Sequence, residues 1–359
     1  MIRPYINTIS RMDQARRKNS SVELFRILAT IMVVIVHYNG WLAGGMPDHF
    51  DLSGVTFSTV SQAVIEGFTA VCVNCFLVIT GFYGVKLKPK TFWNMWILLV
   101  SIYVPCEIVM QLHVGTFSPR PLIDDFIAFT RESYYVQDYL MLVFLSPVLN
   151  TFIDKNGKKI LPYALVFWGI EIVFDWICHN QSLGFAQGYS LIHFILMYIL
   201  GRTAFLYRNA IQNVGCIRLG GGYIALCLLI SCIYIVGMKS EWSYAYSNPL
   251  NIAASFCLFF VFQKRSFYNK AINKIAASTF SVYILHTCAP LINVIRKIDV
   301  YTLANYSYTI YLLIALAVVC AAYLIGTLYD FARLALTKKL TDHMFEILCK
   351  RINLKFEYK

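Results

Sequence analysis

Residues 21–37 read SVELFRILATIMVVIVH, and this run continues as a mostly apolar stretch to residue 42. A transmembrane helix needs about 20 mostly apolar residues to cross a hydrocarbon core of about 30 Å, and residues 22–42 meet that requirement. Further stretches of the same kind follow along the chain. The ten predicted spans are 22–42, 59–84, 92–112, 134–153, 160–178, 189–207, 216–238, 248–264, 275–296 and 306–333. The sequence therefore predicts an all-α integral membrane protein, a polytopic bundle of about ten transmembrane helices.

The composition favours a membrane protein and excludes several other classes. Of 359 residues, 58% are hydrophobic and only 14% are charged, whereas soluble domains average about 25% charged residues. A disordered tail, a nucleic-acid module and most soluble enzymes are excluded, so we expect membrane lipids and not nucleic acid as partners. The eleven cysteines lie mainly in apolar runs and lack the paired spacing of a zinc site. We expect no metal.

The distribution of Lys and Arg predicts the orientation in the membrane. The two tails and the loops on their side carry 25 basic residues, while the loops on the other side carry five. Because basic residues accumulate on the cytoplasmic side, we expect both termini in the cytoplasm. The predicted organisation is a basic N-terminal tail (1–21), a ten-helix membrane domain (22–333) and a basic C-terminal tail (334–359).

Ionisable side chains inside predicted spans mark candidate sites, because placing them in hydrocarbon is costly. They are Glu23, Arg26, His37, Glu66, Glu107, Asp138, Glu171, Asp175, His193 and His286. Most fall toward the outer ends of their helices, which favours a polar cavity that opens outward. We expect Glu107, Asp138, Glu171 and Asp175 to bind substrate there. The alternative is that the side chains nearest the helix ends, such as Asp138, only extend to the membrane interface.

Among these ionisable residues, Arg26 and His37 give the most specific indication of a site. They are 11 residues apart, which in a helix is about 16 Å along one face. A cation at the inner end and a general-base candidate near the outer end suit an extended ligand such as acyl-coenzyme A, because Arg binds phosphate oxygens and histidine titrates near working pH. The alternative is a plain ion pair of Arg26 with Glu23 and a core histidine that is fully hydrogen-bonded.

Five motifs in order resemble the acyltransferase-three family, bacterial membrane enzymes that acylate surface polysaccharides and related sugars. The first is residues 21–37, in which a basic residue precedes a histidine by 11 positions. The others are VNCFLVITGF (73–82), YYVQDYLMLVFLSPVLN (134–150), LMYILGR (196–202), and Asn248-Pro249 with STFSVYILH (278–286). The resemblance covers about residues 21–290, and a ten-helix architecture with cytoplasmic termini is also that of the family.

The resemblance implies a cytoplasmic acyl-coenzyme A donor, commonly acetyl-coenzyme A, and a cell-envelope glycan or lipid-linked sugar as acceptor. It implies His37 as the base, Arg26 as a donor-binding or helix-orienting cation, and a location in the bacterial inner membrane. Lys86, Lys88 and Lys90 stand where the family has an arginine pair, and we expect them to bind the donor phosphates.

The remaining site assignments are one substrate contact and a supporting group. Tyr135, in the aromatic motif, is expected on the acceptor side. Thr80 and Gly81 are expected to let two helices approach closely, and Tyr283 and His286 to act as supporting residues on one helix face. The sequence departs from the family pattern at Cys72, Asn74 and Thr80 and at Tyr134-Tyr135, and the first two of these put the donor pocket in question.

Two other functions stay open at this point. The first is a polytopic secondary transporter or glycan exporter, because intramembrane acids and histidines also build proton relays. Transporters typically have matching halves with broken helices, and no such internal similarity is present in this sequence. The second is a scaffold for another glycan enzyme, for which replacement of both His37 and Arg26 would leave activity intact.

Overall fold

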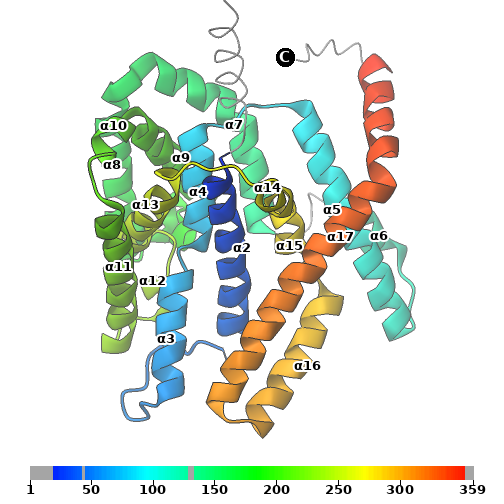
Figure 1. The fold of residues 1–359 in the computed structure, drawn as a ribbon, viewed down its shortest axis with the longest axis horizontal. Helices are drawn as coiled ribbons and strands as arrows, with labels where there is room; N and C mark the ends of the chain where they lie inside the picture. Colours follow the sequence, from blue (N-terminus) through cyan, green and yellow to red (C-terminus); the bar gives the residue numbers. More distant parts are fainter. Residues whose placement is uncertain (1–18, 43–44, 128–132, 352–359) are drawn as a thin grey trace, which may run out of the picture.

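The computed structural model describes residues 19–42, 45–127 and 133–351, and the regular secondary structure in these ranges is all helical (Figure 1). The first half of the chain forms α2 (Ser20–Trp41), α3 (Phe57–Thr69), α4 (Cys72–Tyr83), α5 (Pro89–Val114), α6 (Pro119–Ile127), α7 (Tyr134–Asn156), η1 (Gly157–Lys159) and α8 (Ile160–Glu171), and a π-helical turn, η2 (Ile172–Ile177), continues α8. Residues 1–18 and 352–359, which belong to the two predicted tails, lie outside the described residues.

The second half is also helical. After the short turns η3 (Gln181–Leu183) and η4 (Ala186–Gly188) come α9 (Leu191–Leu206), α10 (Arg208–Ile211), α11 (Cys216–Val236), α12 (Ser240–Ser243), α13 (Pro249–Gln263), α14 (Lys270–Ala276), α15 (Thr279–Leu285), α16 (Ala289–Asn305) and α17 (Tyr308–Arg351). The all-helical prediction is confirmed, and the chain is a multi-pass membrane protein.

The described part of the structure contains fewer long apolar helices than the ten predicted spans. Within the described ranges, six helical runs are long and apolar enough to cross a membrane, or seven if one bent pair counts as a span. They are Ser20–Trp41, Phe57–Tyr83, Pro89–Val114, Tyr134–Ile177, Cys216–Val236 and Tyr308–Arg351. The run from Tyr134 contains two of the predicted spans. α9 and α13 have 16 and 15 residues, about 24 and 22 Å at 1.5 Å per residue, which is shorter than the hydrocarbon core.

The predicted span 275–296 is broken. α15 ends at Leu285 and α16 begins at Ala289, and the two arms meet at 79°. Pro290 in the first turn of α16 has no N–H to continue a hydrogen-bond ladder from α15, so a new helix starts there in a new direction. The break leaves His286 as the C-terminal cap residue of α15, beside the first helix.

Small residues set the closest helix contacts. A Cβ at Gly81 of α4 would lie 2.6 Å from the carbonyl oxygen of Tyr198 and 2.9 Å from the Cα of Gly201, both on α9. The two backbones therefore touch at Gly81. Glycine is required here because any side chain would overlap the facing backbone.

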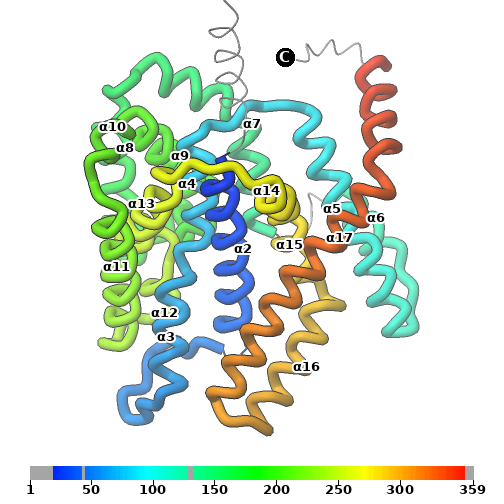
Figure 2. The backbone as a smooth tube through the Cα atoms, in the orientation of Figure 1, coloured from blue at the N-terminus to red at the C-terminus, as the bar shows by residue number. Residues whose placement is uncertain are grey.

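The two ends of the described chain lie at one end of the molecule. In Figure 1, α2 begins and α17 ends at the upper end, which we call the terminal face. Figure 2 shows α17 running obliquely past α16 from the lower end back to this face. α17 continues without interruption through residue 333, the predicted end of the membrane domain, to Arg351.

Candidate active site

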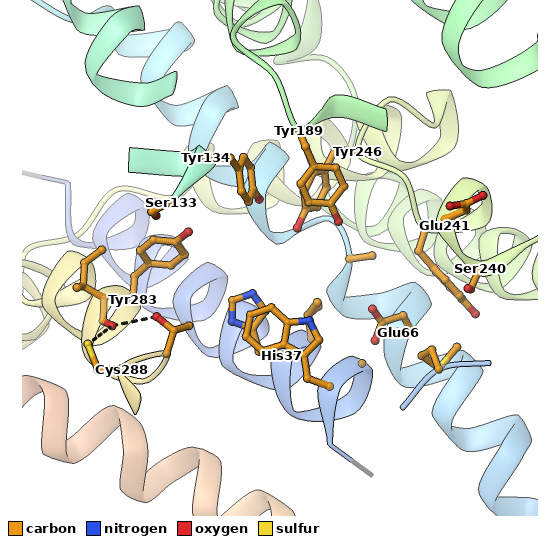
Figure 3. Close-up of a pocket in the computed structure, with 18 of the residues that line it drawn as sticks. His37, Glu66, Ser133, Tyr134, Tyr189, Ser240, Glu241, Tyr246, Tyr283 and Cys288 are labelled. Atoms are coloured by element: carbon orange, nitrogen blue, oxygen red, sulfur yellow. Dashed lines mark hydrogen bonds between the residues drawn. The ribbon is translucent and has the colours of Figure 1, made fainter. Parts of the chain in front are cut away.

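A cavity of about 650 Å³ surrounds His37. Its wall combines the second half of α2, Glu66 of α3, the α15–α16 junction and the segments around α7, α9 and α12 (Figure 3). We call it the outer cavity, because α2 runs away from the terminal face and His37 lies in its last two turns. The lining combines polar and aromatic side chains, which is typical of a site that binds a small polar ligand.

His37 is held by two rings. Its Nδ1 lies 2.7 Å from Nε2 of His286, and its ring stacks on Trp41 with centroids 4.0 Å apart and an interplanar angle of 9°. The second nitrogen of His286, Nδ1, lies 3.0 Å from the carbonyl oxygen of Val282. The broken helix thus brings a second histidine, 249 residues away in sequence, against the first.

This geometry assigns the protons when both rings are neutral. The carbonyl of Val282 can only accept, so Nδ1 of His286 carries the proton and Nε2 of His286 carries the lone pair. Nδ1–H of His37 then donates to that lone pair. The remaining nitrogen of His37, Nε2, is therefore unprotonated, which is the state that a general base requires.

Tyrosines form much of the remaining wall. The ring of Tyr189 lies between two others. Its centroid is 4.9 Å from that of Tyr134 and 4.7 Å from that of Tyr246. Tyr246 lies in the loop before α13, and burial raises the pKa of its hydroxyl well above the usual value. It is therefore a neutral hydrogen-bonding group at physiological pH.

A second cavity, of about 370 Å³, lies nearer the terminal face along the same helix. We call it the inner cavity. Arg26 and Glu23 line it and form an ion pair of 2.8 Å. Tyr135 and Thr80 line it as well, and Thr80 donates to the carbonyl of Phe76 at 2.8 Å.

Tyr283 borders both cavities. On α2, Val33 lines the inner cavity and Val36 lines the outer one, a single helical turn apart. The ring of Tyr283 lies 5.0 Å from the ring of Tyr135 and 6.1 Å from that of His286, centroid to centroid. The two cavities are therefore neighbours, and His37 lies on the outer side of the boundary between them.

Of the three predicted phosphate-binding lysines, Lys86 and Lys88 lie between α4 and α5, and Lys90 lies in the first turn of α5. Lys86 and Lys88 are exposed, and Lys90 forms a 3.1 Å ion pair with Asp342 of α17. None of the three lines either cavity, but Thr91, the residue after Lys90, lines the inner one.

Glu171 and Asp175 are fully buried away from both cavities. Glu171 contacts Nδ1 of His193 at 2.7 Å, and Nε2 of His193 lies 2.9 Å from Oδ1 of Asn74. One oxygen of Asp175 accepts from the backbone N–H of Gln187 at 3.2 Å. Through these contacts Glu171 connects α8 to α9 and α4, and Asp175 connects η2 to η4. The structure therefore does not bring the two acids to His37.

The other two predicted substrate contacts also lie elsewhere. Glu107 accepts from the side chain of Gln111 on the same helix at 3.0 Å, and Gln111 in turn donates to Ser118 before α6. Asp138, on α7, is half-buried. Neither residue lines the outer or the inner cavity.

Several lining residues had no assigned role in the sequence. Trp41 lies four residues after His37, so helical spacing could have placed it on the same face. Glu66 has only its location inside a predicted span as a signal. Glu241 lies on the four-residue helix α12, and Tyr189 and Tyr246 lie in loops. These segments are too short for a periodicity to indicate which way a side chain faces. In the described part of the chain, no three His, Cys, Asp or Glu side chains are grouped as a metal site would need.

Comparison with known proteins gives one match. A family model described as "Acyltransferase domain" matches residues 19–328. No curated protein and no solved structure matches the chain. The match extends from the start of α2 into α17 and includes the residues that line both cavities.

Proposed function

The chain belongs to the acyltransferase-three family, and from this premise we propose that it is a membrane O-acyltransferase. It transfers an acyl group, most simply acetyl, from acyl-coenzyme A to a hydroxyl of a cell-envelope glycan or lipid-linked sugar. The observation that carries the proposal is the position of His37, in the outer cavity beside the boundary with the inner cavity. The membrane concerned is the bacterial inner membrane, with both termini in the cytoplasm.

The donor enters from the terminal face into the inner cavity. Arg26 is the cation along this path, and it retains exposure, with 34% of its side chain accessible. Its guanidinium has donors beyond the one used by Glu23, and these suit a phosphate or carbonyl oxygen of the donor. Lys86 and Lys88, exposed on the same side, suit the charged end of coenzyme A outside the cavity. Tyr135 and Tyr139 then flank the arm that carries the thioester.

The acceptor hydroxyl enters the outer cavity and meets the thioester at the boundary. Nε2 of His37 takes the hydroxyl proton while the oxygen attacks the thioester carbonyl carbon. The carbon–sulfur bond then breaks, and the coenzyme A thiolate takes the proton back from Nε2. The products are the sugar ester and coenzyme A thiol, so the step needs no covalent enzyme intermediate.

Replacement of His37 by Ala tests the proposal. We expect surface glycans of cells that carry H37A to lose the acyl mass, because loss of a general base costs about 10²–10⁴ in rate. The measurement is the mass per glycan repeat unit, compared with cells that carry His343→Ala, which alters an exposed histidine on α17. An unchanged glycan mass with H37A, at equal protein levels in the membrane, would discard the role of His37.

The purified protein separates the enzyme from a transporter. Slow hydrolysis or binding of acetyl-coenzyme A supports the acyltransferase, whereas proton-coupled uptake of a glycan without any effect of coenzyme A supports transport. The broken α15–α16 pair resembles transporter helices in form, but its contact between His286 and His37 supports the acyltransferase proposal.

A further inference from the structure

One end of the outer cavity is acidic. Glu66 of α3 and Glu241 of α12 both line it, and Figure 3 shows them on the same side of His37. Among the described residues that line the cavity, none is Lys or Arg. A ligand in the outer cavity therefore meets carboxyl groups, hydroxyls and aromatic rings, and no permanent cation.

Glu66 is mostly buried at this end of the cavity, and only one of its two carboxyl oxygens is hydrogen-bonded within the described residues. Its side chain is 7% exposed, and Oε2 accepts a hydrogen bond from Nδ2 of Asn39 at 2.8 Å. Oε1 has no hydrogen-bond partner among the described residues. Because Glu66 lines the outer cavity, this oxygen can accept a hydrogen bond from a ligand that carries a donor.

Gly40 leaves the path from Glu66 to His37 open. It lies three residues after His37, on the same face of α2, and lines the cavity. A Cβ at this position would lie 4.0 Å from Oε1 of Glu66. Any larger side chain at residue 40 would occupy the space between the base and the carboxyl group.

We infer that the acceptor unit entering the outer cavity is an uncharged sugar, whose hydroxyls donate to Glu66 and Glu241 and whose ring packs on the tyrosines. This inference rests on the proposed acyltransferase function. A sugar carboxylate or phosphate at the same place would face two carboxyl groups and find no cation to pair with, and burying an unpaired anion is costly. An uncharged sugar supplies hydroxyl donors, which match the free oxygen of Glu66.

The first test compares acceptors that differ only in charge. The full-length enzyme is given acetyl-coenzyme A and pairs of methyl hexuronides and their hexuronamides, in the gluco, galacto and manno series, and acyl transfer is followed by mass spectrometry. We expect the uncharged amide to be preferred about tenfold or more in kcat/KM, because a cavity lined by one sign of charge discriminates by about this factor. Equal or better use of the uronides would overturn the inference.

Charge-removing variants give the matched comparison. The double variant Glu66→Gln with Glu241→Gln keeps the side-chain shapes, and we expect it to reduce the preference for the amide toward unity. Glu346→Gln, an exposed carboxylate on the last turns of α17, is the control and should keep the wild-type preference. A preference that survives the double variant unchanged would contradict the assignment to these two residues.

A second test needs no acceptor. Ser240→Cys places a thiol in the outer cavity, and peptide mass mapping follows its reaction with a cationic and an anionic methanethiosulfonate reagent. Relative to a small thiol in solution, we expect the cationic reagent to be favoured about tenfold, and this advantage to fall in the double variant. An equal or reversed ratio would refute the acidic cavity.

The outcomes separate the two proposals. Acylation of both acceptor types at equal rates removes the charge selectivity and leaves the acyltransferase standing. Failure to acylate any acceptor, together with a glycan mass that does not depend on His37, removes the proposed function, and the thiol labelling then still decides the charge of the cavity.

Discussion

His37 is oriented by His286, which lies far from it in the sequence, and by Trp41 on its own helix. Its Nδ1 is engaged by His286, whose own Nδ1 donates to the carbonyl of Val282, and Trp41 covers one face of the ring. The sequence grouped His286 with Tyr283 as a supporting pair. The structure places it as a positioning residue, because it selects which nitrogen of His37 carries the lone pair.

Replacement of His286 tests that role at the residue scale. We expect His286→Ala to lower kcat about 100-fold, since small losses of orientation have costs of this size, with little change in KM for acetyl-coenzyme A. His286→Gln should recover part of the rate, because its amide oxygen can accept from Nδ1–H of His37. If the Ala and Gln variants are equally impaired, or if KM rises instead of kcat falling, His286 only supports the fold.

Helix contacts at the element scale depend on glycines and on one break. Gly81 brings α4 against α9, which aligns Thr80 with the inner cavity. The break before Pro290 turns α16 away from α15 by 79° and leaves His286 at the end of a helix. The first of these features places Thr80 at the wall of the inner cavity, and the second places His286 against His37.

Gly81→Ala tests the close approach of α4 and α9. Its Cβ would lie 2.6 Å from a backbone oxygen, so we expect a loss of about 1–3 kcal/mol in the free energy of unfolding through overpacking. Thermal unfolding of the detergent-solubilised protein measures it. Gly169→Ala in α8 is the matched control, because no atom lies within 4 Å of the added Cβ. A melting temperature for Gly81→Ala at or above that of the wild type would contradict the contact.

At the scale of the whole molecule, two adjacent cavities lie along α2. The inner cavity lies toward the terminal face and the outer cavity lies beyond it, with Tyr283 at their boundary. This arrangement suits two substrates that arrive from opposite sides of a membrane and react at one histidine.

Thiol labelling from each side tests the arrangement of the cavities. Thr91→Cys lines the inner cavity and Ser240→Cys the outer one. We expect a membrane-impermeant thiol reagent to modify residue 240 in intact spheroplasts and residue 91 only in inverted vesicles, with sites identified by peptide mass because native cysteines are present. Modification of both positions from the same side would exclude access from opposite sides.

Much of this protein could be read from the order of its residues alone. Hydrophobic length indicates helices that cross a membrane, and the spacing of Arg26 and His37 places both on one face of α2, because the helical period depends only on local backbone geometry. The five family motifs could also be read from the sequence, and they indicated the acyltransferase family. The structure places four acids that were expected to contact substrate away from both cavities: Glu107, Asp138, Glu171 and Asp175. Their role in substrate binding stays a prediction.

Only the tertiary structure decided which side chains meet across helices. Helical periodicity fixes the face on which a residue lies, but not the neighbour that this face contacts, because that depends on how distant segments pack. His286 therefore reached His37 because the chain turns at Pro290 in a direction that the local sequence does not specify, and Glu171 reached His193 instead of a cavity. For the same reason the carboxyl group of Glu66, one of many acids inside predicted spans, became identifiable as a cavity residue only once α3 was packed beside α2.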